Sequence, residues 1–80
     1  MFYKNRANPA EANKQIQLEF SDGTTQNVNL NIDETTVDIL NTNGINSIRL
    51  TVLDVYNTMN NGAKRIEFYG FGNNLLVFFY

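Results

Sequence analysis

The segment IQLEFSDGTTQNVNLNI, residues 16–32, alternates apolar and polar side chains on both sides of a turn. Alternation with a period of two is typical of a strand that buries one face. Asp22-Gly23 lies between the two runs and favours a type I′ turn, because Gly adopts positive φ freely and Asp tolerates it. The segment therefore predicts a β-hairpin. We expect its inward-facing side chains to be Ile16, Leu18 and Phe20 on the first strand and Val28, Leu30 and Ile32 on the second.

The rest of the chain repeats this pattern of short strands and turns. Val37, Ile39 and Leu40 form a third apolar group, which ends at the turn signal Asn43-Gly44. The longest strand pattern covers residues 47–56. Its alternation changes parity at Leu53, which predicts either a β-bulge or a change of sheet near Leu53-Asp54.

Two more strands are expected after a polar loop at residues 57–62. In the first, Ile66 and Phe68 alternate with polar side chains. The second, residues 75–80, reads LLVFFY and is apolar on both parities, so it needs cover on both faces. Near the start of the chain, Asn8, Pro9 and Glu11 have the spacing of a capped helical turn.

Six short strands separated by turns predict an all-β domain over residues 1–80, either an antiparallel β-sandwich or a barrel. A two-sheet sandwich usually needs about 100 residues to close both faces, and this chain has 80. The alternative is therefore a half-domain that is completed by self-association.

Composition limits the chemistry. The chain has no Cys and no His, which leaves oxygen ligands alone for any metal, and we expect neither a metal nor a cofactor. Six basic residues against eight acidic ones give a net charge of −2 and no basic stripe, so nucleic acid is not an expected partner. No apolar run is long enough for a membrane span.

Catalysis is not expected either. The densest carboxylate group is Asp33, Glu34 and Asp38, and these residues flank a polar turn, where solvent equalises their pKa values. Gly70-Phe71-Gly72 matches half of a phosphate-binding fingerprint, but a strand follows it where a helix is required. A tight bend is the simpler interpretation.

Three runs carry a family resemblance: QIQLEFSDGTTQNVNL at 15–30, NSIRLTVLDVY at 46–56 and NNGAKRIEFYGF at 60–71. Together, over residues 3–72, they resemble the C-terminal half of the galactose-binding-like (discoidin-type) jelly rolls. The similarity is greatest to the glycan-binding domain associated with bacterial NAD-glycohydrolases, whose pattern Tyr3, Asn5-Arg6 and Ser21-Asp22-Gly23 match. Residues 75–80 form an additional apolar strand.

The resemblance implies a non-catalytic, secreted or cell-surface jelly-roll module that binds sugars in many members and proteins or lipid head groups in others. Residues 1–14 lack a secretion signal, so export would require a longer precursor, and the compartment is left unassigned. The family's N-terminal half has no counterpart before Met1. Lys64 and Arg65 stand where many members have a Ser-Glu pair that helps to hold Ca²⁺, so the calcium site is not carried over.

A sugar site needs aromatic faces and planar hydrogen-bonding groups. Arg49 and Phe71 are minor candidates for such a site. The alternative is that the tyrosines complete the core and the asparagines make turns. The main candidates are Tyr56, Arg65, Tyr69, Asn57, Asn60 and Asn61.

The two ends of the chain favour a second interpretation. They carry more apolar strand surface than one small sandwich hides, which predicts either a homo-oligomer that closes the core or pairing with a missing N-terminal half-domain. In this interpretation the protein is an assembly subunit without a small-molecule ligand. The expected interface residues are Leu75, Leu76, Val77, Phe78, Phe79 and Tyr80.

Overall fold

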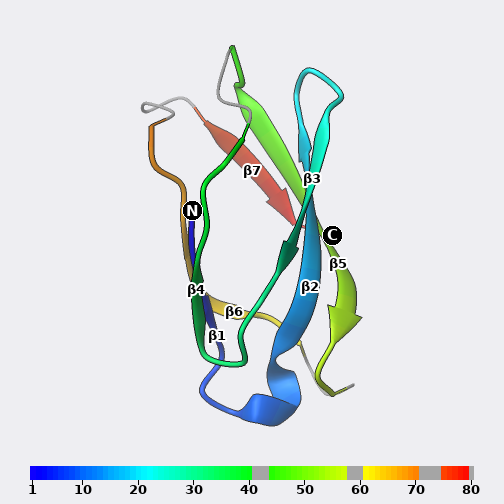
Figure 1. The fold of residues 1–80 in the computed structure, drawn as a ribbon, viewed down its shortest axis with the longest axis vertical. Helices are drawn as coiled ribbons and strands as arrows, with labels where there is room; N and C mark the ends of the chain where they lie inside the picture. The colour runs from blue at the N-terminus through cyan, green and yellow to red at the C-terminus, as the bar shows by residue number, and fades with distance from the viewer. Residues whose placement is uncertain (41–43, 58–60, 71–74, 80) are drawn as a thin grey trace.

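The computed structural model describes residues 1–40, 44–57, 61–70 and 75–79, which form seven strands and one 3-10 helix, η1 (Pro9–Glu11). Figure 1 shows two sheets facing each other, one with strand order β4-β1-β6 and the other with order β3-β2-β5-β7. An all-β, β-sandwich-like architecture is therefore confirmed. The strands are β1 (Phe2–Asn5), β2 (Asn13–Phe20), β3 (Thr25–Asn29), β4 (Glu34–Thr36), β5 (Ser47–Val55), β6 (Ala63–Glu67) and β7 (Leu76–Phe79).

The expectation of a wholly antiparallel sandwich is wrong for one pair of strands. β7 runs parallel to β5, with Ser47 opposite Leu76 and Arg49 opposite Phe78. After β5 the chain crosses to the other sheet as β6 and then returns to the end where β5 begins. A long crossover of this kind is what a parallel pair requires.

The hairpin of β2 and β3 is confirmed, but its turn is not type I′. Gly23 has φ +89° and no described non-glycine residue has a positive φ, so Asp22 does not adopt the required conformation. The loop holds three residues instead, because Phe20 N donates to Thr24 O at 2.8 Å and Gly23 N donates to Phe20 O at 2.9 Å. The Asp22 carboxylate stabilises it by accepting from Thr24 N at 3.0 Å.

Two bulges set which side chains face the interior where β2 pairs with β5. Gln15 lies opposite Asp54 while Ile16 lies opposite Val52, which confirms the predicted bulge at Leu53. A second bulge, on β2, was not predicted. Asn13 and Gln15 lie opposite adjacent residues of β5, so Lys14 is the extra residue. The consequence is that Asn13, in place of Lys14, faces inward and is 2% exposed.

The core lies between the two sheets. Every predicted inward residue of the first hairpin is buried except Ile32, which is 48% exposed because β3 ends at Asn29 and Ile32 belongs to the following turn. Leu40 is 83% exposed, while Val37 and Ile39 pack against the core. The predicted helical turn is confirmed as η1, where the side chain of Asn8 accepts a hydrogen bond from Ala10 N. The buried cluster is Met1, Tyr3, Ile16, Leu18, Phe20, Val28, Leu30, Ile45, Ile48 and Leu50.

Candidate functional site

The structure does not bring the predicted sugar-binding residues together. Arg65 and Tyr69 contact Glu67 on the outer side of the β4-β1-β6 sheet. Tyr56 and Asn61 lie at the end of the sandwich near η1, where both are hydrogen-bonded to Ala12 O. Asn60 and Phe71 lie outside the described residues.

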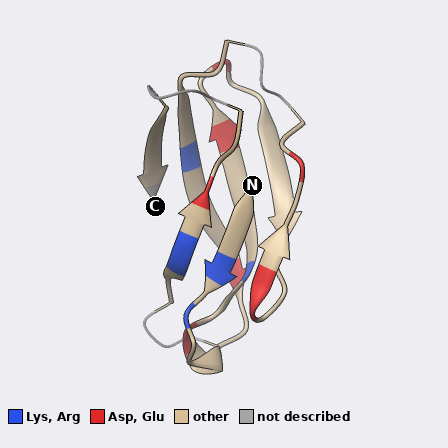
Figure 2. Cartoon of the chain, turned by 90° about the vertical axis from the view of Figure 1, so that its left-hand side faces the viewer, with Lys and Arg blue, Asp and Glu red and all other residues tan. Residues whose placement is uncertain are grey.

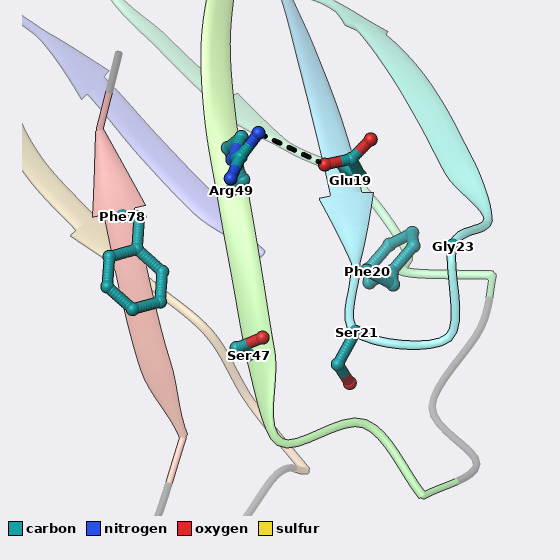
Figure 3. Close-up of a pocket in the computed structure, with 7 residues that line it drawn as sticks. All are labelled: Glu19, Phe20, Ser21, Gly23, Ser47, Arg49 and Phe78. Atoms are coloured by element: carbon teal, nitrogen blue, oxygen red, sulfur yellow. Dashed lines mark ion pairs between the residues drawn. The ribbon is translucent and has the colours of Figure 1, made fainter.

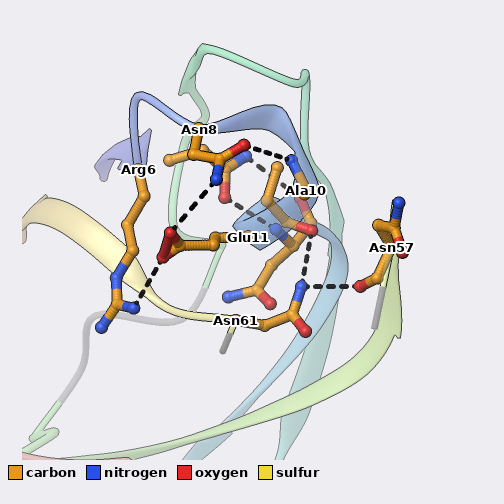
Figure 4. A network of polar contacts seen from close by, with 9 residues as sticks. Arg6, Asn8, Ala10, Glu11, Asn57 and Asn61 are labelled. Atoms are coloured by element: carbon orange, nitrogen blue, oxygen red, sulfur yellow. Dashed lines mark hydrogen bonds and ion pairs between the residues drawn. The ribbon is translucent and has the colours of Figure 1, made fainter. Parts of the chain in front are cut away.

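At the η1 end of the sandwich, the predicted sugar-binding residues Tyr56 and Asn61 donate hydrogen bonds to backbone carbonyl groups. The Tyr56 hydroxyl donates to Leu30 O at 2.6 Å, and the Lys14 ammonium lies 5.8 Å from the centre of its ring. Asn61 Nδ2 donates to Asn57 O at 2.9 Å and to Ala12 O at 3.1 Å (Figure 4). Because these polar atoms are engaged within the chain, the turn-forming interpretation accounts for them without a ligand.

On the β4-β1-β6 sheet, the outward-facing cations Lys4 and Arg65 pair with nearby acids. A bulge at Lys64 places it and Arg65 side by side in the exposed part of β6. Lys4 Nζ lies 3.3 Å from Asp33 and 3.6 Å from Glu34, and its hydrogen bond to Asp33 raises the pKa of Lys4. Figure 2 shows the basic segments of β6 and β1 on neighbouring strands, with acidic segments at the end of β6 and at the start of β4.

Arg65 belongs to a second charge-matched group on the same sheet. Glu67 accepts hydrogen bonds from the Tyr69 hydroxyl and the Arg65 guanidinium, and these bonds lower the pKa of Glu67. Arg65 also lies over the ring of Phe2, at 5.8 Å from its centre. No group of three or more acidic side chains that could hold a metal occurs within the described residues.

The outer face of the other sheet has a different character. Here β2 pairs with β3 and β5 so that polar side chains from the three strands share one surface, opposite the buried face. We call this surface the amide face, because Asn and Gln side chains form much of it. Its residues are Gln15, Gln17, Glu19, Thr25, Asn27, Asn29, Arg49 and Thr51.

A cleft of about 330 Å³ lies beside the amide face, between the β2–β3 turn and β7. Figure 3 shows Glu19 and Ser21 from β2 and its turn, Ser47 and Arg49 from β5, and the Phe78 ring from β7. Arg49 Nη1 lies 3.6 Å from Glu19 Oε1. The Phe78 side chain is 46% exposed and therefore available to a ligand.

Backbone contacts fix the two serines of the cleft. Ser21 N donates to Ser47 O at 3.0 Å, which joins the end of β2 to the start of β5. The Ser21 hydroxyl oxygen accepts from Asn46 N at 3.1 Å. The cleft thus combines a matched ion pair, two hydroxyls and an aromatic ring on a backbone that is tied together at that end.

The sequence offered a partial signal for this cleft. Because Ile48 and Leu50 face inward, alternation places Arg49 outward, and Arg49 was one of the minor candidates. The same alternation places Gln17, Asn27 and Asn29 outward, on what becomes the amide face. What the sequence lacked was the parallel pairing that puts Phe78 beside Arg49.

The last predicted strand, at residues 75–80, is present as β7 (Leu76–Phe79), and its role as an interface stays a prediction. Leu76 is 61% exposed and Phe78 is 46% exposed, so the described residues leave the outer face of β7 uncovered. Leu75, which precedes β7, packs against the core. Tyr80 and the side chain of Phe79 lie outside the description. Within the described residues, no helix is long and apolar enough to cross a membrane.

Comparisons of the chain with protein-family models, with curated proteins and with solved structures found no match. The class of fold comes from the structure alone: it is an all-β domain with one antiparallel and one mixed sheet. The resemblance to galactose-binding-like jelly rolls stays a prediction.

Proposed function

We propose that the protein is a non-catalytic binding module that recognises a neutral glycan at the cleft of Glu19, Ser21, Ser47, Arg49 and Phe78. The observation that carries the proposal is the position of the exposed Phe78 ring beside the Arg49–Glu19 pair. Sugar rings present an apolar face and several hydroxyls, which an aromatic ring and planar charged groups complement.

Size and charge agree with such a ligand. The cleft volume of about 330 Å³ falls within the range of about 300–1,000 Å³ that is usual for small-molecule sites. Its one cation and one carboxylate cancel, so the cleft does not favour an anionic polymer. Beyond the cleft, Gln17 and Thr51 are paired on the amide face and extend the polar surface available to a longer chain.

The cleft does not support glycoside hydrolysis. Most glycosidases use two carboxyl groups placed across the scissile bond. Among the described residues that line the cleft, only Glu19 carries a carboxyl group, and it is engaged by Arg49. The carboxylates at Asp33 and Glu34 lie against Lys4 on the other sheet. Recognition without turnover is therefore the function that this arrangement favours.

A glycan array, followed by calorimetric titration of each hit, tests the proposal. Phe78→Ala and Arg49→Ala should each weaken binding by roughly tenfold, because a central aromatic or Arg contact contributes about 1–2 kcal/mol. Tyr69→Ala and Arg65→Ala are the matched controls on the other sheet and should leave the affinity unchanged.

Two outcomes would contradict the proposal. One is the absence of binding to any glycan at millimolar concentration. The other is a loss of affinity in the Tyr69 and Arg65 variants with none in the Phe78 variant, which would move the site to the β4-β1-β6 sheet.

A second candidate function, assembly, is favoured by the exposure of Leu76 and Phe78 on β7, an edge strand without charges. Exposed apolar edge strands invite pairing with another chain. If assembly is the function, sedimentation should show a dimer or larger species that Phe78→Asp dissociates and that Tyr69→Asp does not. A monomer at all concentrations would remove this candidate.

A further inference from the structure

Two buried asparagines connect the start of β2 to its surroundings, and they differ in how well their amides are paired. Asn5 Nδ2 donates to Asn13 O at 3.1 Å and to Asn31 O at 2.8 Å, while its Oδ1 accepts from Asn13 N at 2.8 Å. Asn13 Nδ2 donates to the Tyr3 hydroxyl at 2.7 Å, but Asn13 Oδ1 has no hydrogen-bond partner among the described residues. The Asn5 amide therefore has partners for both its nitrogen and its oxygen, whereas no described donor group reaches the oxygen of the Asn13 amide.

Reversing the Asn13 amide does not remove the deficit. If its oxygen and nitrogen are exchanged, the Tyr3 hydroxyl donates to Oδ1 and the Nδ2 group is left without an acceptor. A buried polar atom without a partner is strongly unfavourable, and native proteins rarely leave one. Something other than the described side chains therefore completes Asn13.

Asn13 lines a cavity of about 230 Å³ between the sheets. The walls are mostly apolar, from Leu50, Val52 and Ala63, with the Tyr3 side chain alongside. The space is partly open to solvent, and its volume exceeds the roughly 30 Å³ that one water molecule occupies in the liquid. None of the described residues that line the cavity is charged.

The segment Asn61-Gly62 forms another side of the cavity and is tied down. Asn61 Nδ2 is held by two carbonyls, and Gly62 N donates to Glu11 O at 3.2 Å. The Arg6 guanidinium packs so closely on Gly62 that a Cβ added there would meet Arg6 Nη2 at 2.7 Å. Arg6 in turn pairs with Glu11 at 3.0 Å. This side of the cavity is therefore built from mutually supporting contacts.

We propose that the cavity is a second ligand site, which takes a small neutral molecule with an apolar body and one hydroxyl group. The hydroxyl donates to Asn13 Oδ1, and the body packs against Leu50, Val52 and Ala63. The site is separate from the glycan cleft, because Asn13 begins β2 and the cleft residues Glu19 and Phe20 end it. Its occupation does not depend on the proposed glycan binding.

Phenol and toluene are the probes, because they have nearly the same size and only phenol donates a hydrogen bond. Titration of the full chain followed by ¹H–¹³C methyl NMR should show shifts at Leu50, Val52 and Ala63. Phenol should bind several-fold more tightly than toluene. In Asn13→Leu that preference should disappear, and Ala63→Leu, which fills the cavity, should abolish the binding of both.

Control variants make the result specific. Phe78→Ala, in the glycan cleft, should leave phenol binding unchanged. The failure of one proposal therefore does not imply the failure of the other. If Asn13→Leu does not fold, Tyr3→Phe combined with Asn13→Leu removes both polar partners, and the phenol–toluene comparison on the unaltered chain needs no variant. Equal affinities for the two probes, or binding of neither because ordered water alone fills the cavity, would overturn the proposal.

Discussion

The two sheets differ most in how completely they bury their inner faces. On the β3-β2-β5-β7 sheet, Ile16, Leu18 and Ile48 have no exposed surface. On the β4-β1-β6 sheet, Tyr3 is buried but Ile66 and Phe68 are only partly covered. The difference shows that the β2–β5 pair is the structural centre, while the smaller sheet acts as its cover.

The outer faces differ in a related way. On the smaller sheet, Lys4 pairs with Asp33 and Arg65 pairs with Glu67. The larger sheet carries amides and hydroxyls, with the Phe78 ring at one side. Matched charges on a surface contribute little to stability. Amides beside an aromatic ring retain capacity for a ligand, which is why we place the proposed glycan site on the larger sheet.

The largest difference should appear when one core side chain is truncated on each sheet. Ile48→Ala should lower the free energy of unfolding by about 2–5 kcal/mol, because it opens a cavity in a fully buried layer. Ile66→Ala removes the same atoms from a partly covered position and should cost clearly less. Urea unfolding followed by circular dichroism measures both. An equal or greater loss in Ile66→Ala would show that the smaller sheet is not merely a cover.

The inner face of the larger sheet was predictable because uninterrupted alternation fixes it. Ile16, Leu18, Phe20, Ile48 and Leu50 are all buried as the period of two requires. Prediction failed where a local event changes the parity. The bulge at Lys14 turns Asn13 inward, and nothing in a single sequence distinguishes a bulged Lys from one that continues the strand.

The candidate site was less predictable than the fold, because it depends on which strands become neighbours. The sequence indicated an outward Arg49, yet Phe78 reached it only through a parallel pairing set by the crossover. Grouping Tyr56, Asn57 and Asn61 with Arg65 and Tyr69 assumed that closeness in sequence meant closeness in space. Instead β6 carries Arg65 along the smaller sheet, away from the loop that holds Asn61.

We expect a loss of stability of intermediate size when a glycine beside each sheet is replaced by alanine. Gly23→Ala, in the hairpin of the larger sheet, should destabilise by roughly 1 kcal/mol, because φ +89° is unfavourable for a residue with a Cβ and that atom would contact nothing. Gly62→Ala, before β6, has no such backbone constraint. Its Cβ should only displace the flexible Arg6 side chain and leave stability nearly unchanged.

Thermal unfolding of the two alanine variants makes this comparison. The Gly62 variant should also weaken the Arg6–Glu11 ion pair, which NMR of the Arg6 side chain would report. A Gly62→Ala loss as large as that of Gly23→Ala would mean that the packing of Arg6 matters more to the fold than the hairpin turn.

The smallest effect concerns Glu67 on the outer side of the smaller sheet. Its hydrogen bond from Tyr69, followed by that from Arg65, holds the pKa of Glu67 below its usual range. A carboxyl group whose pKa is depressed by folding binds its proton less readily in the folded state. Its contribution to stability is therefore present above the unfolded-state pKa and is lost as the pH falls through the folded-state pKa.

An NMR titration of the Glu67 side chain carboxyl tests this prediction. Tyr69→Phe should raise the pKa of Glu67 more than Arg65→Ala does, since the hydroxyl is the larger influence. Arg49→Ala removes a cation from the opposite sheet and should leave the pKa of Glu67 unchanged. An unchanged pKa in Tyr69→Phe would mean that the three side chains do not interact in solution. In that case the smaller sheet would offer Arg65 and Tyr69 to a ligand, and the contrast between the two outer faces would weaken.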